Sequence, residues 1–330
     1  MRDICLCLEA HKDCLYHLGF RNTITVSSLS RANENRDYRI YEELGQYLIK
    51  HIRPLYVGTT LSDVATDDTI YALDSTIIST SVRLASWALG KYSKGAVKVH
   101  TLLDLRGSIP VNIHITDGKW NDNNMWVRLP IECGAIYTAD KAYVDLAQMW
   151  HIQQAGAFFV MRPKNNMRFQ VTHELTDDRL ISSVCADYGA TLTGYKSRRL
   201  YPGELRIVKV NDPETQERVT FMTNIFDFNP LEIANIYRHR WDVEVFYKWL
   251  KQNVTTKSLW GYSENAHLGC HFGLSVVSKD KGGNKKPVFH YGNCHSDTCF
   301  CFGTKRSAGT ADAAKQLFHF QSKCQRTQFI

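Results

Sequence analysis

Five residues between positions 237 and 251 combine charge and spacing in a way that could do chemistry. Tyr237, Arg240, Glu244, Lys248 and Lys251 follow one another at intervals of three or four residues. On a helix with ~100° per residue they form one stripe roughly 80° wide, beside an apolar side. One interpretation is a solvated face with spaced ion pairs, in which Glu244 precedes Lys248 in the favourable order. The other is a site that presents a carboxylate among cations.

Two aspartates favour the second interpretation. Asp74 lies in an apolar strand segment between Leu73 and Ile77, where a carboxylate is costly unless it is paired or bound to a cation. Asp140 follows a later strand at its carboxyl end, where sites of α/β proteins tend to lie. If these strands are neighbours, Glu244 on a crossing helix could complete a group of three. Taken singly, Asp74 could be a turn residue and Asp140 a helix cap.

Three carboxylates a few ångströms apart repel one another, and divalent cations relieve that repulsion. Two Mg²⁺ ions ~4 Å apart activate a water or a 3′-hydroxyl and stabilise the leaving oxygen of a phosphodiester. The three acidic residues together therefore favour metal-dependent phosphodiester chemistry.

A βββαβαβ segment must position these residues. Three apolar or alternating runs with short turns predict an antiparallel meander, followed by two more strands with a helix at 146–156 between them. The predicted strands are 70–80, 96–105, 111–116, 134–140 and 157–163.

Helical and β-rich segments flank this core. Apolar residues at every fourth position predict helix within 27–53, and residues 164–228 resemble β-hairpins with polar turns. Asn229 is a plausible N-cap, followed by Pro230 at the first helical position, and the helix is predicted to run to about Gln252.

Composition limits the class of protein. The 330 residues are 44% hydrophobic and 22% charged, as in an ordinary globular chain of about two domains. No run of 18 apolar residues predicts a membrane span, and no signal peptide is visible. The ten cysteines are too sparse for a disulfide scaffold, so we expect a reducing, cytoplasmic setting.

The net charge of +7 is concentrated at the end of the chain. Residues 254–330 hold ten of the 40 basic and four of the 33 acidic residues. From His271 onward the chain has few large aliphatic side chains and no visible period, so we expect the tail at 266–330 to be poorly ordered.

With these residues in place, the chain resembles the DDE transposases of the insertion-sequence four (IS-four) family. The pattern Tyr-x2-Arg-x3-Glu-x6-Lys at 237–251 is the signature of that family's YREK group. Further matches are ALDST around Asp74, TADKAYVD around Asp140, VMRPKNN at 160–166 and RANENRDYRIY near the N-terminus.

The resemblance implies an α/β, RNase H-like core: a mixed five-stranded sheet with flanking helices, a β-rich insertion subdomain and an N-terminal helical region. It predicts five parts. These are a helical region at 1–65, the first part of the core at 66–163, the insertion at 164–228, the last core helix at 229–265 and the tail at 266–330.

The resemblance also implies the chemistry. Asp74, Asp140 and Glu244 would be the catalytic metal ligands for two Mg²⁺ ions, which Mn²⁺ could replace. The residues expected to contact DNA are Tyr237, Arg240, Lys248, Lys251, Arg162 and Lys164, with further cations at Lys196, Arg198 and Arg199. For Arg162, Lys164 and the three cations of the insertion, a solvated basic surface is at least an equal alternative. The reaction would be hydrolytic nicking at insertion-sequence ends followed by strand transfer into target DNA, by a homodimer in the bacterial cytoplasm or on the nucleoid.

The match fades after residue 266. The composition beyond it leads to the hypothesis that the tail is translated in a shifted frame, and the N-terminus is expected to be truncated relative to the family. Two functional alternatives follow: an inactive relic that binds DNA or inhibits intact transposase, and a nuclease that cleaves DNA without joining it.

Weaker features surround the predicted core. Lys98 and His100 point the same way along the second strand and could face the site, and Asp117 and Asp122 could support it from behind or serve in turns. Trp260 could stack on a base, and the histidines and cysteines of 290–301 match no paired zinc-ligand spacing.

Overall fold

The computed structural model describes residues 1–56, 58–59, 61–80, 95–175, 183–211, 217–253, 263 and 265–266. These residues fall into two compact units, one holding Met1–Asn35 and the other the described residues from Arg36 onward. The predictions about the tail beyond 266, about Trp260 and about the histidines and cysteines of 290–301 lie outside the described residues.

The first unit is helical, as predicted. It consists of α1 (Arg2–Ala10), α2 (Lys12–Leu15), the 3₁₀ helix η1 (Tyr16–Leu18) and α3 (Val26–Asn35). Gly19 ends η1 with a φ of 82°, a left-handed conformation that a residue without a Cβ adopts at little cost.

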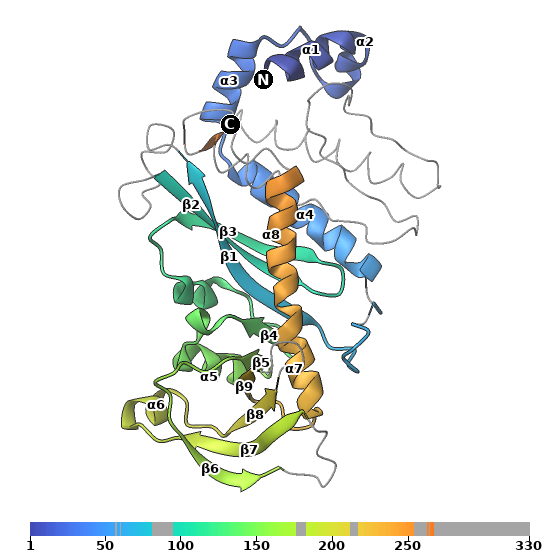
Figure 1. Ribbon diagram of the computed structural model, residues 1–330. Coiled ribbons are helices and arrows are strands. Elements are labelled where there is room, and N and C mark those ends of the chain that lie inside the picture. Colours follow the sequence, from blue (N-terminus) through green and yellow to red (C-terminus); the bar gives the residue numbers. More distant parts are fainter. Residues whose placement is uncertain are drawn as a thin grey trace. The chain divides into compact units, whose positions relative to one another are not determined.

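The second unit is built on one large sheet (Figure 1). Its first five strands lie in the order β3-β2-β1-β4-β5: β2 pairs antiparallel with both β1 and β3, while β1, β4 and β5 run parallel. This is the predicted RNase H-like core. The bounds are β1 Ile70–Thr80, β2 Gly95–Asp104, β3 Ile109–Asp117, β4 Ile136–Ala139 and β5 Phe158–Met161.

The β-rich insertion continues this sheet. Strand β9 pairs antiparallel with β5 through Val160–Thr223 and Met161–Met222, and the order then runs on to β8, β7 and β6, giving nine strands. Their bounds are β6 Phe169–Glu174, β7 Val184–Leu192, β8 Leu205–Asn211 and β9 Arg218–Thr223.

One segment of the insertion differs from the prediction. Residues Tyr195–Leu200 form a short helix, α6, where a hairpin strand was expected. The sequence YKSRRL does not alternate apolar and polar residues, and its Lys and Arg are good helix formers. Lys196, Arg198 and Arg199 are exposed on this helix.

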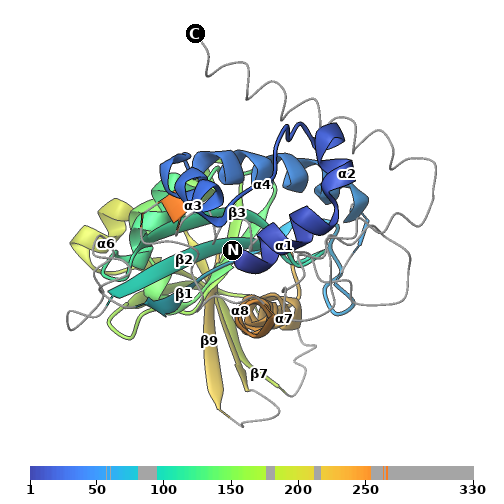
Figure 2. The ribbon, with the colours of Figure 1, turned by 90° about the horizontal axis from the view of Figure 1, so that it is seen from above.

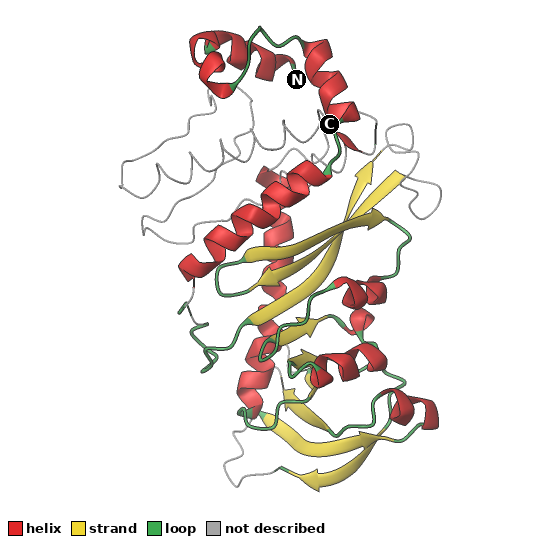
Figure 3. Cartoon of the chain, turned by 180° about the vertical axis from the view of Figure 1, so that it is seen from behind, coloured by secondary structure: helices red, strands yellow, loops and turns green. Residues whose placement is uncertain are grey.

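Helices cover both faces of the sheet (Figure 2). Side chains of β1 alternate, so that Ile70 and Ala72 pack with α7 and α8 on one face while Tyr71 and Leu73 pack on the other. Helix α4 (Arg39–Ile52) lies across the second face and leads into η2 (Arg53–Tyr56), as Figure 3 shows from behind. The same face carries α5 (Leu146–Gln154) and the 3₁₀ helices η4 (Asp122–Arg128) and η5 (Lys141–Tyr143).

The predicted single helix after Asn229 is two helices, α7 (Pro230–His239) and α8 (Trp241–Asn253). Its start is as predicted: the Asn229 side chain accepts from Leu231 N, and Glu232 closes a capping box. Near Arg240 the backbone bonds tighten to three-residue spacing, with Arg240 N donating to Tyr237 O. No Pro or Gly marks this break in the sequence, so the helical wheel could not locate it.

Within the described part of the chain, no helix combines the length and apolar character needed to cross a membrane.

Candidate active site

Asp74 lies inside β1, and Asp140 directly follows the neighbouring strand β4. Strands β1 and β4 are parallel, and Leu73 pairs with Ala139. Asp74 and Asp140 each come one residue after this pair, so their backbones lie side by side. The prediction that the two strands are neighbours is confirmed.

Glu244 reaches this edge from α8. The fully buried Tyr247, one turn beyond Glu244, donates a hydrogen bond to Asp74 O at 2.8 Å and lies 3.3 Å from Val99 O. The hydroxyl therefore fixes α8 against β1 at the position of Asp74. Sequence analysis missed Tyr247, although its place on the wheel, between the apolar side and the charged stripe, would have indicated it.

Arg240 lies between two of the carboxylates. Its Nη1 is 2.9 Å from Glu244 Oε1 and 4.0 Å from Asp74 Oδ2. The side chain is only 13% exposed, and its guanidinium lies 5.6 Å from the ring centre of Tyr237 and 5.9 Å from that of Trp241. The break between α7 and α8 thus places a cation among the acids.

The electrostatics of Asp74 reflect this crowding. The pKa of its carboxyl is raised to about 6, chiefly by burial and also by Glu244 and Asp140, while a hydrogen bond from Ser75 N and the charge of Arg240 oppose the rise. Burial also raises the pKa of Tyr237, with Asp140 adding to the rise while Arg240 and Arg162 lower it. Asp74 therefore interacts with both of the other carboxylates.

The other predicted DNA contacts are less concentrated. Lys248 and Lys251 are exposed on α8, and Arg162 is exposed just after β5, close enough to influence Tyr237. Lys164 Nζ donates to Val144 O at 2.7 Å, which ties the segment after β5 to the segment after β4.

The donor chemistry of the site fits a hard divalent cation, because carboxylate oxygens are the ligands that Mg²⁺ and Mn²⁺ prefer. In the described residues, no three His, Cys, Asp or Glu side chains lie close enough together to hold a metal ion as they stand. A guanidinium occupies the space between Asp74 and Glu244, so a cation bound to both would have to displace it.

The prediction that Lys98 and His100 could face this site is wrong. In the β1–β2 register His100 pairs with Ser75 rather than with Asp74, so its side chain lies on the opposite face of the sheet. There Asp122 Oδ2 binds Lys98 Nζ at 2.7 Å, and Asp122 Oδ1 accepts from Ser75 Oγ at 2.9 Å.

Asp122 has further partners on that face. Its Oδ1 is also 3.3 Å from the Tyr143 hydroxyl and 3.6 Å from His100 Nδ1. Asp117 has the predicted turn role, accepting from Lys119 N at 2.8 Å.

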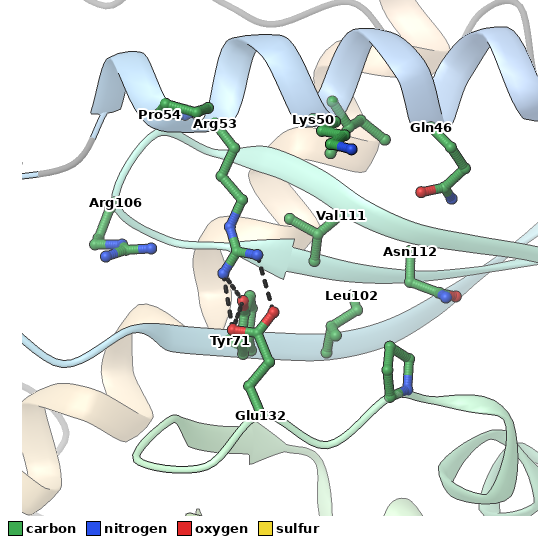
Figure 4. Close-up of a pocket in the computed structure, with 12 residues that line it drawn as sticks. Gln46, Lys50, Arg53, Pro54, Tyr71, Leu102, Arg106, Val111, Asn112 and Glu132 are labelled. Atoms are coloured by element: carbon green, nitrogen blue, oxygen red, sulfur yellow. Dashed lines mark hydrogen bonds and ion pairs between the residues drawn. The ribbon is translucent and has the colours of Figure 1, made fainter.

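A pocket on the same face lies between α4 and the sheet (Figure 4). Arg53 binds Glu132 at 2.9 Å and Asp104 at 3.3 Å, and Tyr71 donates to Glu132 at 2.7 Å. Arg106 binds Asp104 at 2.9 Å. Each acid here has a cationic partner, so the cluster attaches η2 to the sheet.

The fold is that of an RNase H-like core, and comparison with known proteins identifies the family. Residues 65–266, more than half of the chain, match the family model described as transposase DDE domain. The chain belongs to this family.

Three curated relatives agree with this assignment. The chain is 30% identical over 202 residues to y4zB of Sinorhizobium fredii, a candidate transposase, covering 59% of this chain and 54% of that protein. It is 28% identical over 195 residues to a Geobacillus stearothermophilus protein named as transposase for insertion sequence element IS5377, covering 59% and 51%. The chain therefore spans about half the length of these two relatives.

The third relative is the candidate transposase for insertion sequence element IS4SA of Synechocystis, 27% identical over 253 residues, covering 74% of this chain and 67% of that protein. Its name is consistent with the predicted IS-four family, and membership of the YREK group stays a prediction. Among solved structures, a piggyBac transposase synaptic complex with hairpin DNA matches with a TM-score of 0.38 at 11% identity, over 68% of this chain and 50% of that one.

Proposed function

We propose that this chain is a DNA transposase that cleaves and joins phosphodiester bonds at insertion-sequence ends. The observation that carries the proposal is that Asp140 and Glu244 both lie near enough to Asp74 to raise the pKa of its carboxyl, on an RNase H-like sheet in a member of the transposase DDE domain family. Asp74 and Asp140 come from adjacent parallel strands, and Glu244 from the helix that Tyr247 fixes over them.

The three carboxylates are the proposed ligands of two Mg²⁺ ions, with Mn²⁺ as a substitute. When bound, such ions activate a water or a 3′-hydroxyl and stabilise the leaving oxygen. The protein's own part is to hold the carboxylates on rigid strands and a packed helix, which fixes the geometry in advance.

The cations around the carboxylates would bind the DNA backbone. Arg240 offers a planar fork that matches a phosphate, while Lys248, Lys251 and Lys164 act as point charges. Arg162 and Tyr237 complete this proposed surface. The proposed substrate is double-stranded DNA, held by a homodimer that joins two ends in the bacterial cytoplasm.

The test is nicking of supercoiled plasmid by the full chain with Mg²⁺ or Mn²⁺. We expect metal-dependent nicking that falls by a factor on the order of 10³ or more in Asp74→Asn and in Glu244→Gln, because each change removes a metal ligand. Asp227→Asn is the matched control, since this exposed acid lies outside the site. Nicking that persists in both site variants would overturn the assignment.

Two further outcomes separate the alternatives. Transfer of a labelled 3′-hydroxyl oligonucleotide into the plasmid supports a transposase, whereas nicking without joined product indicates a nuclease. DNA binding by a folded protein that cleaves nothing with either metal would indicate an inactive relic.

A further inference from the structure

Arg240 is bonded in an unusual way for a nearly buried arginine. In the described part of the chain its guanidinium donates to one carboxylate, from Nη1 to Glu244 Oε1 at 2.9 Å, and it also interacts with the side chain of Tyr237. The same Nη1 lies 4.0 Å from Asp74 Oδ2, and Nε is buried without a hydrogen-bond partner among the described residues. The guanidinium is thus held at the acids mainly by charge.

A second buried arginine in the same unit, Arg206, has hydrogen-bond partners for all three guanidinium nitrogens. Arg206 binds Asp187 through Nε at 2.8 Å and Nη2 at 2.7 Å, and its Nη1 donates to backbone carbonyls, including Phe228 O at 2.6 Å. It is 4% exposed. Arg240 has the burial of a structural arginine without these bonds.

We propose that Arg240 is an internal counter-ion that holds Asp74 and Glu244 together in the metal-free protein and is displaced when a divalent cation binds. This rests on the proposed function, because it concerns the same carboxylates. The single positive charge and the divalent cation compete for the same oxygens, and like charges at about 4 Å repel strongly in a partly buried site.

The structure offers the displaced side chain a second position. Trp241 is adjacent to Arg240, is 58% exposed, and already has the guanidinium 5.9 Å from its ring centre. Rotation toward this ring keeps a favourable cation–π contact while moving the charge toward solvent. There the freed fork can bind a phosphate, so metal binding would precede the contact between Arg240 and DNA.

The test is Mn²⁺ binding to the full chain without DNA, measured from the electron paramagnetic resonance signal of free Mn²⁺. We expect Arg240→Gln to bind Mn²⁺ at least about tenfold more tightly than the natural protein, because the competing charge is gone. Arg240→Lys should stay close to the natural protein because it keeps that charge. Arg238→Gln is the matched control: it removes an exposed arginine two residues away and should change little.

Failure of this inference differs from failure of the proposed function. If the natural protein binds Mn²⁺ and loses it in Asp74→Asn, but Arg240→Gln binds no more tightly, the inference is overturned while the metal site stands. If no variant binds Mn²⁺ at millimolar concentration, both fall. Circular dichroism verifies folding, and Arg240→Met, which keeps the apolar stem, replaces the Gln variant if that one is unfolded.

Discussion

Buried acids on the two faces of the sheet have different numbers of cationic and hydrogen-bond partners. On the face opposite α8, Asp122 is bound by Lys98, Ser75 and Tyr143, and Asp104 is bound by two arginines. On the α8 face, Asp74 has Ser75 N and a distant guanidinium as its side-chain partners, with two other acids nearby.

Burial alone does not explain the contrast. The side chains of Asp122 and Asp74 are 24% and 19% exposed. Burial raises the pKa of Asp122, but Lys98 and Ser75 lower it more, so it ends below its ordinary value. The pKa of Asp74 is raised to about 6. Asp74 thus has less compensation from neighbouring positive charge and hydrogen bonds than Asp122, which is consistent with the proposed cation site.

Removing an acid from the compensated face should therefore destabilise the fold. Asp104→Asn leaves Arg53 and Arg106 without their shared carboxylate, and we expect a loss of about 2–4 kcal/mol in the free energy of unfolding. Urea denaturation at neutral pH measures it. Asp227→Asn, at an exposed position, should stay within about 0.5 kcal/mol. Equal effects of the two changes would contradict the assignment of Asp104 to a structural cluster.

The pH dependence of the free energy of unfolding gives a second test of this comparison. Burial lowers the pKa of His100 to about 4, and Asp122 only partly opposes this. A folded pKa below the ordinary value of 6.5 contributes stability that is present above pH 6.5 and lost as pH falls toward 4. We expect this histidine to account for about 2–3 kcal/mol over that window.

The measurement is the free energy of unfolding at several pH values for the natural protein and His100→Gln. The variant should lose stability less steeply between pH 6.5 and 4. His151→Gln is the control, since His151 is exposed on α5. Parallel pH profiles for the natural protein and His100→Gln would show that His100 is not buried in its neutral form.

The sequence predicted most of what depends on local pattern. Apolar runs located β1 to β5 to within about two residues at most ends, and the hypothesis that the strands of Asp74 and Asp140 are neighbours was correct. The capping residues at Asn229 and Glu232 located the start of α7. These features depend on residues close together in sequence, so they can be predicted without knowledge of the tertiary structure.

Predictions that depended on strand register or tertiary contact were wrong, or were not made. The face of the sheet on which His100 lies depends on which β1 residue it opposes, and a shift of one residue in register would place its side chain on the other face. The break at Arg240 leaves no sequence mark, and the Asp104 cluster joins η2 to β2 across the sheet. The continuation of the sheet into the insertion depends on only two β5–β9 residue pairs.

In the proposed site, Asp74 and Glu244 share the nearly buried Arg240, and together with Asp140 they would bind a divalent cation. The most direct test of this central claim is the free energy of unfolding at pH 7.5, with and without Mn²⁺, for the natural protein and Asp74→Asn. Because the pKa of Asp74 is raised, its stabilising effect is lost as pH rises through about 6, so without metal the variant should be more stable by about 1–3 kcal/mol.

Mn²⁺ at a hundred times its dissociation constant should then stabilise the natural protein by about 2.7 kcal/mol and the variant hardly at all. A metal-free Asp74→Asn that is destabilised as strongly as Asp104→Asn, together with equal Mn²⁺ effects on both proteins, would contradict the account.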